Sequence, residues 1–248
     1  MRQLITLLAA ILTFNVAFSQ GSFSKSFEQK LDPFHKIVVS PKIDLVLIPG
    51  ETESIRIEYI GVDKEKIIID QSGKKVHVYL EDAKIFDIGE RRQNMFDRRE
   101  RYRMATVTAY VTFKSLSVIE TRGEGSVYCD GKIAARKLKI KAYGDTDVRL
   151  AYVDAAKVKA RLYGDNTMKI MDGDAGHISY KLFGDNKIDS RGLRCVTSNT
   201  TIYGDGQVSL NATEEVRLNS FGDPSLFVTG SPNISKGIVI GHTNIRRN

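Results

Sequence analysis

Hydrophobic and polar residues alternate through the C-terminal half of the chain on both sides of a recurring tripeptide. This tripeptide, aromatic-Gly-Asp, stands at Tyr143-Gly144-Asp145, Tyr163-Gly164-Asp165, Phe183-Gly184-Asp185, Tyr203-Gly204-Asp205 and Phe221-Gly222-Asp223. Its glycines are 20, 20, 20 and 18 residues apart. The residues two, four and six positions before each glycine are mostly apolar, as are those four and six positions after it. Because alternation with a period of two is typical of strands, each repeat predicts a short strand, a Gly-Asp turn and a second short strand.

A repeat of this kind cannot bury its apolar face alone, so equivalent strands are expected to stack. Stacking at roughly 4.8 Å per strand predicts an all-β fold, a parallel β-helix or β-solenoid with rungs of about 20 residues. We expect the solenoid repeats over residues 116–248. An antiparallel stack of hairpins is the alternative arrangement. A propeller blade needs about 40 residues, twice this period, which argues against a propeller.

The N-terminal half lacks the repeat but is also rich in predicted strands. Its short alternating or apolar runs cover residues 35–39, 43–48, 55–59, 67–70, 76–80 and 106–113. Turn residues such as Pro49-Gly50 and Ser72-Gly73 separate them, so residues 20–115 are predicted to form a β-rich N-terminal module. A charged insertion at 81–103 interrupts this module, and its segment 90–103 holds six Arg and three acidic residues. It is interpreted as a solvated insertion or as a cationic patch for an acidic polymer.

The first 19 residues have the pattern of a secretory signal peptide. Arg2 precedes an apolar run from Leu4 to Phe14, and the small residues Ala17 and Ser19 stand at a predicted cleavage site. An anchored transmembrane helix is the alternative, although the run is shorter than the ~20 residues of a typical span. We therefore expect an exported protein, in the periplasm or at the cell surface, whose mature chain does not span a membrane.

Export would permit a disulfide, but the chain holds only two cysteines, Cys129 and Cys195. They fall at different phases of the repeat and about three rungs apart, on the order of 14 Å along the axis. A disulfide requires Cα atoms within about 7 Å. We predict that both are free thiols buried in the core.

An ordered series of degenerate motifs runs through nearly the whole mature chain. The series is Phe34-x-x-Ile37-x-Val39, then Ile43-Asp44-Leu45-Val46-Leu47, Pro49-Gly50, Ser54–Ile57, Gly73 with Val76-His77-Val78, Val111–Ile119, and finally the rungs with Gly-Asp turns. In this order it resembles the bacterial head GIN domain family, whose members are also named as auto-transporter adhesin domains, over residues 34–240. The resemblance implies an exported all-β protein with a β-helical part, common in Bacteroidota, and a role in adhesion. It carries no catalytic residues to transfer.

Composition and motifs restrict the chemistry further. The formal net charge is +7 and the isoelectric point is about 9.3, which favours acidic partners. The four histidines are scattered, and no sequence motif for zinc, nucleotide or nucleophilic catalysis is present. We therefore expect no catalytic residues, no metal and no cofactor. Nucleic acid is not an expected partner either, because no motif of a nucleic-acid-binding module occurs.

The repeated carboxylates are the one candidate for catalytic or metal chemistry. Asp145, Asp165, Asp185, Asp205 and Asp223 would form a ladder with neighbours about 5 Å apart. That separation is close to the distance between the two carboxylates of retaining glycosidases. Three interpretations stay open: turn structure, calcium binding between rungs, and catalysis. In the first, each Asp forms a turn with the glycine before it, at Gly144, Gly164, Gly184, Gly204 and Gly222. A uniform ladder favours turn structure, since catalytic carboxylates need different environments.

Alternation also places the residues one, three and five positions before each glycine on the outer side of the sheet. On this flank a column of aromatic residues would stand beside basic residues. The candidate ligand-binding residues are Lys141, Tyr143, Arg161, Tyr163, Lys181, Phe183 and Tyr203. Aromatic rings stack on sugars and cations attract anions, so the flank suits an acidic polysaccharide or another envelope component. The alternative is that the rings turn inward and pack as core.

Three functions follow from these features. The first is a non-enzymatic, adhesin-like envelope protein that binds carbohydrate or another envelope component. The second is a polysaccharide-active hydrolase or lyase that uses the Asp ladder. The third is a structural protein whose β-solenoid self-associates.

Overall fold

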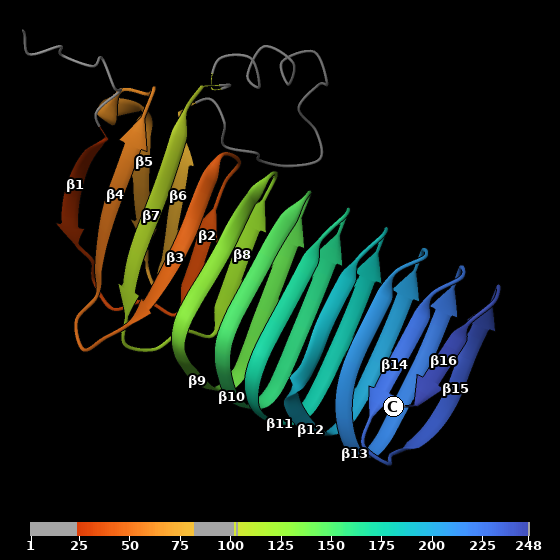
Figure 1. Ribbon diagram of the computed structural model, residues 1–248. Coiled ribbons are helices and arrows are strands. Elements are labelled where there is room, and N and C mark those ends of the chain that lie inside the picture. Colours follow the sequence, from red (N-terminus) through yellow and green to blue (C-terminus); the bar gives the residue numbers. More distant parts are fainter. Residues whose placement is uncertain (1–23, 82–101, 103, 248) are drawn as a thin grey trace, which may run out of the picture.

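The computed structural model describes residues 24–81, 102 and 104–247 (Figure 1). The predicted signal peptide at 1–19 and nearly all of the charged insertion at 81–103 lie outside these residues. The described part is almost entirely strand, and its one helical segment is a short 3-10 turn at Lys64–Lys66. The predicted all-β class is therefore confirmed.

Sixteen strands follow one another along the described chain. They are β1 (Lys25–Lys30), β2 (Lys36–Val39), β3 (Ile43–Pro49), β4 (Ser54–Ile60), β5 (Ile67–Ser72), β6 (Lys75–Leu80), β7 (Thr106–Phe113), β8 (Val118–Arg122), β9 (Gly125–Tyr143), β10 (Thr146–Tyr163), β11 (Thr167–Phe183), β12 (Lys187–Tyr203), β13 (Gln207–Phe221), β14 (Ser225–Thr229), β15 (Asn233–Ile240) and β16 (Asn244–Arg247).

Strands β9 to β13 each form one rung of a β-solenoid of about 6 turns. Each rung pairs in parallel with the next, and the register follows the repeat, so that Val148 lies beside Met168 and Tyr163 beside Phe183. Parallel pairing excludes the antiparallel stack of hairpins. Figure 1 shows each rung running down one layer, bending, and returning in the second layer.

Four names describe a rung, with β10 as the example. The first arm (146–150) follows one Gly-Asp turn and the second arm (157–163) leads into the next. The row of Gly-Asp turns along one rim of the solenoid is the Gly-Asp corner, and the opposite curve (151–156) is the far bend.

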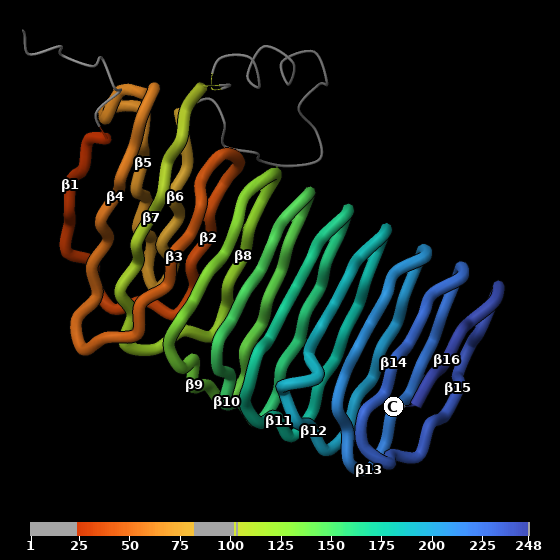
Figure 2. The backbone as a smooth tube through the Cα atoms, viewed as in Figure 1, coloured from red at the N-terminus to blue at the C-terminus, as the bar shows by residue number. Residues whose placement is uncertain are grey.

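The N-terminal strands continue both layers of the solenoid. In one layer β3 pairs with the first arm of β9, and β7, β4 and β1 follow outward. In the other, β8 pairs with the second arm of β9, and β2, β6 and β5 follow. Figure 2 shows the backbone of the two layers running through without a break. The buried residues of both halves accordingly form one hydrophobic cluster.

The core is made by the predicted inward positions. Every residue two, four or six positions before the five repeat glycines, or four or six after them, is buried. Some of these residues are polar, among them Ser198, Thr200 and Ser220. Cys129 and Cys195 are buried free thiols, as predicted from their phases.

The Gly-Asp corner requires glycine because neighbouring turns are in close contact. Gly164 has φ +104°, and a Cβ atom there would lie 2.4 Å from the carbonyl oxygen of Gly144. Its N–H donates to the carbonyl oxygen of Phe183 on the next rung at 2.9 Å. An L side chain would therefore be strained by its backbone angle and would displace the neighbouring turn.

Candidate binding surface beside the Gly-Asp corner

The aromatic residues of the repeat form one continuous stack on the outside of the second arms. Ring centroids lie 5.1 Å apart for Tyr143–Tyr163, 4.6 Å for Tyr163–Phe183, 4.7 Å for Phe183–Tyr203 and 4.6 Å for Tyr203–Phe221. The planes of neighbouring rings differ by at most 7°. Tyr143 and Tyr203 are each 39% exposed. The column therefore faces solvent, and the alternative that the rings pack as core is wrong.

Stacking determines which part of each ring a ligand could reach. The ring spacing matches the strand spacing of roughly 4.8 Å, so inner rings such as Tyr163 are covered on both faces by their neighbours. Their edges point outward. A sugar ring therefore cannot stack face to face on the middle of this column, and contact would occur through ring edges and tyrosine hydroxyls.

Basic residues lie beside the aromatic column on the same layer. The parallel register aligns Lys137 with Lys157 and His177, Lys139 with Lys159, and Lys141 with Arg161 and Lys181. Of these basic residues, only Lys141 lies within 4.0 Å of a carboxylate of the described residues. On the first arms, by contrast, Arg149 is paired with Asp147 at 2.7 Å, and just beyond the first arm of β12 Arg191 is paired with Asp189 at 2.7 Å. The second arms therefore carry an uncompensated positive surface.

The titration of this surface reflects the crowding of like charges. The pKa of Lys159 is lowered, mainly by the positive charge of Lys137, with burial and other cations adding to the effect. Burial, together with Lys157 and Lys159, lowers the pKa of His177. The shift of the Lys159 pKa has the sign expected for a site that attracts anions, whereas that of the His177 pKa comes mainly from burial.

A shallow cleft lies at the centre of this positive surface. It encloses about 220 Å³ and is lined by Lys137, Lys139, Ile140, Lys141, Lys159 and Arg161. Ile140 is the one apolar residue of this lining and is buried, and the methylene stems of the basic side chains supply further apolar surface. We call these five basic residues the cationic cleft.

Glu120, on β8, contacts one residue of the cationic cleft. Its carboxylate lies 2.7 Å from both Lys36 and Arg122 and 3.6 Å from Lys141. Burial alone would raise its pKa, but hydrogen bonds and charge from Lys36 and Arg122 outweigh burial and lower the pKa to about 2. Glu120 is therefore ionised at neutral pH and holds Lys141 at the edge, while Lys159 and Arg161 stay unpaired.

The Asp ladder takes part in the hydrogen bonding of the Gly-Asp corner. Asp205 Oδ1 accepts from the N–H of Asp223 at 2.9 Å, and Asp223 Oδ1 accepts from the N–H of His242 at 2.7 Å. Asp165 accepts from the N–H of Asp185 at 3.4 Å. Within the part of the chain that the structure describes, no group of three or more His, Cys, Asp or Glu could hold a metal ion.

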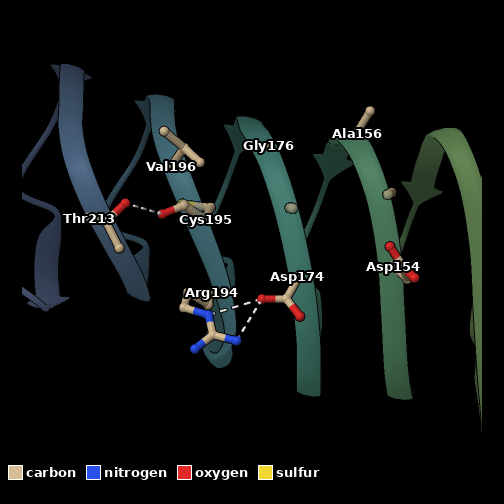
Figure 3. A pocket seen from close by; sticks show the side chains of 10 residues that line it. Asp154, Ala156, Asp174, Gly176, Arg194, Cys195, Val196 and Thr213 are labelled. Carbon is tan, nitrogen blue, oxygen red and sulfur yellow. Dashed lines mark hydrogen bonds and ion pairs between the residues drawn. The ribbon is translucent and has the colours of Figure 1, made fainter.

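A second concave surface follows the far bend (Figure 3). It encloses about 420 Å³, and its floor consists of small residues such as Ala155, Ala175 and Gly176. Its charged residues are paired: Arg194 lies 2.8 Å from Asp174, as the dashed lines of Figure 3 mark, and Lys132 lies 2.6 Å from Asp154. This surface carries no excess charge comparable to that of the cationic cleft.

The sequence profile of the family described as "Putative auto-transporter adhesin, head GIN domain" matches residues 33–232. The chain belongs to this head GIN domain family. The resemblance inferred from the ordered motifs at 34–240 is thereby confirmed.

Solved structures share the head GIN fold at low sequence identity. A putative adhesin from Bacteroides fragilis has a TM-score of 0.72 and 19% identity, with 92% of this chain and 98% of that chain covered. A putative adhesin from Parabacteroides merdae has a TM-score of 0.67 and 16% identity, covering 91% and 96%. A putative lipid binding protein from Parabacteroides distasonis has a TM-score of 0.58 and 14% identity, also covering 91% and 96%. No curated protein matches the chain.

In this head GIN chain the predicted flank residues all lie on the second arms. Sequence reasoning did not assign Lys137 or Glu120 to the site. Lys137 continues the outward alternation seven positions before Gly144, so the same periodicity could have found it. Glu120 stands three positions before Gly123, the same phase as Lys141 before Gly144, so extending the repeat one rung toward the N-terminus could also have found it.

No helix among the described residues is long and apolar enough to cross a membrane.

Proposed function

We propose that this head GIN protein is an exported, non-enzymatic envelope protein that binds an anionic polysaccharide or another anionic envelope component. The observation that carries the proposal is the row of unpaired cations beside a solvent-facing aromatic column. Export is supported by the signal-peptide pattern at 1–19. The adhesin description of the family and of two structural neighbours supports a binding role.

Charge and aromatic edges would act together in this binding. Lys159, Arg161 and Lys181 would attract the anionic groups of the ligand. The hydroxyls of Tyr143, Tyr163 and Tyr203 would donate hydrogen bonds to sugar oxygens. Because these groups repeat once per rung, a polymer lying along the solenoid axis could make the same contact several times, which would raise its apparent affinity.

A glycan array tests this proposal, probed with purified protein at low and at physiological salt. We expect binding to a narrow set of acidic glycans that persists at physiological salt. The double variant Arg161→Ala/Tyr163→Ala should lose this binding, whereas Arg149→Ala, on the opposite layer, should keep it. Binding that vanishes with salt would show that only net charge is recognised, and would contradict the proposal.

The variant Tyr163→Phe separates binding from folding. It keeps the ring between Tyr143 and Phe183 and removes only the hydroxyl. The stack and the unfolding temperature should therefore be unchanged, while affinity for a glycan that uses this hydroxyl should fall severalfold.

Self-association is the second candidate function. Strand β15 pairs with β13, and it exposes Ile238 and Ile240 by 61% and 60%. Exposed apolar residues on an edge strand favour pairing with another chain. Sedimentation of the protein over a range of concentrations would reveal this, and Ile238→Lys should then reduce the apparent mass.

A further inference from the structure

The cationic cleft concentrates more positive charge than a single monovalent anion can balance. Lys139 and Lys159 lie side by side on neighbouring rungs, roughly 4.8 Å apart at the backbone, and Arg161 follows two residues after Lys159. Lys137 and Lys141 complete the lining. Among the described residues, the one carboxylate within 4.0 Å of a cation of the cleft is that of Glu120, which is already paired with Lys36 and Arg122.

Different anions would satisfy this arrangement to different degrees. A carboxylate carries one charge and two oxygens, so it could balance one of the facing cations. A phosphate ester carries up to two charges and has three or more oxygens in tetrahedral directions. The guanidinium of Arg161 can hold two of those oxygens as a fork, and the ammonium groups of Lys139 and Lys159 can approach the others as point charges.

The surroundings of the cleft favour a phosphate that is attached to a sugar. The aromatic column begins at Tyr143, two residues beyond Lys141, and Tyr163 likewise stands two residues beyond Arg161. Its edges and hydroxyls lie next to the cations and would contact a polar ring rather than an acyl chain. An acyl chain in the cleft would have to displace water from the charged ends of the basic residues that line it, which disfavours an acyl chain there.

Building on the proposed function, we propose that the cationic cleft is a phosphate-binding subsite and that the ligand is a phosphorylated glycan. The phosphate would lie among Lys139, Lys159 and Arg161, and the sugar would lie toward the tyrosine edges. Such a group could belong to a free polysaccharide or to the headgroup of a glycolipid, and the shared chemistry is the sugar phosphate.

A matched set of polymers tests this inference by biolayer interferometry at physiological salt. The probes are a phosphomannan, the same mannan after enzymatic dephosphorylation, and a polygalacturonate of equal charge per residue. We expect phosphomannan to bind at least about tenfold more tightly than either of the others. Lys159→Gln/Arg161→Gln should remove this preference, and Arg149→Gln, whose partner Asp147 lies on the opposite layer, should retain it.

The outcomes distinguish this inference from the proposed function. Equal affinity for phosphomannan and polygalacturonate would overturn the phosphate subsite and leave the binding function in place. Absence of binding to every anionic polymer would overturn both. A final arm uses vesicles that carry phosphorylated glycolipid, compared with the same vesicles after dephosphorylation. Phosphate-dependent capture there supports the subsite and assigns the phosphate to a membrane headgroup, whereas equal capture contradicts it.

Discussion

The Gly-Asp corner and the far bend both reverse the direction of each rung, but they do so with different residues and backbone conformations. At the Gly-Asp corner, Gly144, Gly164, Gly184, Gly204 and Gly222 all have positive φ, and an aromatic residue precedes each of them. At the far bend each rung turns differently. Rung β11 uses Gly173 with φ +131°, whereas its neighbour in β10 is Val153. All register shifts between β9 and β13 fall at this bend, and the tube of β12 bulges there (Figure 2).

This difference explains where a binding surface can form. The Gly-Asp corner has the same backbone conformation in every rung, so it fixes the register of the second arms and aligns like side chains in columns. The far bend permits several backbone conformations, so its side chains vary from rung to rung, and charges of neighbouring rungs pair there, as Lys132 does with Asp154 and Arg194 with Asp174. A repeated ligand group could therefore find equivalent contacts along the Gly-Asp corner but not along the far bend.

Gly164→Ala should give the largest loss of stability. The added Cβ atom would lie 2.4 Å from the carbonyl oxygen of Gly144, and the residue would keep a positive φ. We expect a loss of at least about 3 kcal/mol in the free energy of unfolding, measured by urea denaturation.

Gly176→Ala at the far bend is the matched control for that substitution. Its Cβ atom would lie 2.8 Å from the carbonyl oxygen of Ala156, but Gly176 does not have a positive φ. We expect a loss of about 1 kcal/mol. Equal losses for the two glycines would contradict the view that the positive φ of Gly164 makes it the more restricted of the two positions.

Glu120→Gln should have the next largest effect and should reveal a pH dependence. Because the folded-state pKa of Glu120 is lowered to about 2, its contribution is complete above about pH 4.5 and is lost as pH falls toward about 2. We expect the variant to lose about 2 kcal/mol at neutral pH. Urea denaturation at neutral pH and near pH 3 would measure both quantities.

The pH comparison also provides the test of this assignment. At neutral pH the native protein should be more stable than the Gln variant, and the gap should narrow on acidification. A gap that is the same at both pH values would show that the ion pairs of Glu120 with Lys36 and Arg122 do not contribute.

Asn186→Ala should destabilise the protein by about 2 kcal/mol, because it breaks a buried polar chain inside the Gly-Asp corner. Asn186 accepts from Asn166 Nδ2 at 3.0 Å and donates to the carbonyl oxygen of Phe183 at 3.2 Å. At the far bend, Asn211→Ala removes an exposed hydrogen bond to Arg191 and should cost less than about 0.5 kcal/mol. Thermal unfolding of both variants would measure the two losses of stability. The loss for Asn186→Ala should be the larger, and equal losses would contradict the account.

Arg194→Ala should have the smallest effect. It removes the exposed ion pair with Asp174 at the far bend, and exposed pairs of this kind contribute about 0.2 to 1 kcal/mol. We expect a shift below about 0.5 kcal/mol in the free energy of unfolding. A loss as large as that of Asn186→Ala would show that the far bend depends on specific contacts after all.

Much of the solenoid could be predicted because its periodicity is local. Alternation around the repeat glycines identified the inward residues, and their phases correctly kept Cys129 and Cys195 apart. The same alternation identified the outward flank but not the direction of the rings at the corner. Ring stacking settled that direction, since the rung spacing equals the stacking distance of aromatic rings.

Other features depend on contacts that no local pattern records. The buried polar chain joins Thr146, Asn166 and Asn186, but Gly206 and Pro224 follow at the same position of later repeats. The pairing of β2 with β8 joins segments about 80 residues apart in sequence. That pairing places Lys36 beside Glu120. The far bend was not predicted, because each rung bends at different residues.

Mapping the bound ligand onto backbone amides is the most direct test of the central claim that ligands bind beside the Gly-Asp corner. The protein would be titrated with an acidic glycan selected on the array, and amide chemical shifts would be followed by NMR. We predict that the largest shifts fall in residues 137–143 and 157–163, on the second arms of β9 and β10. Shifts concentrated at 154–156 and 174–176, along the far bend, would contradict the account.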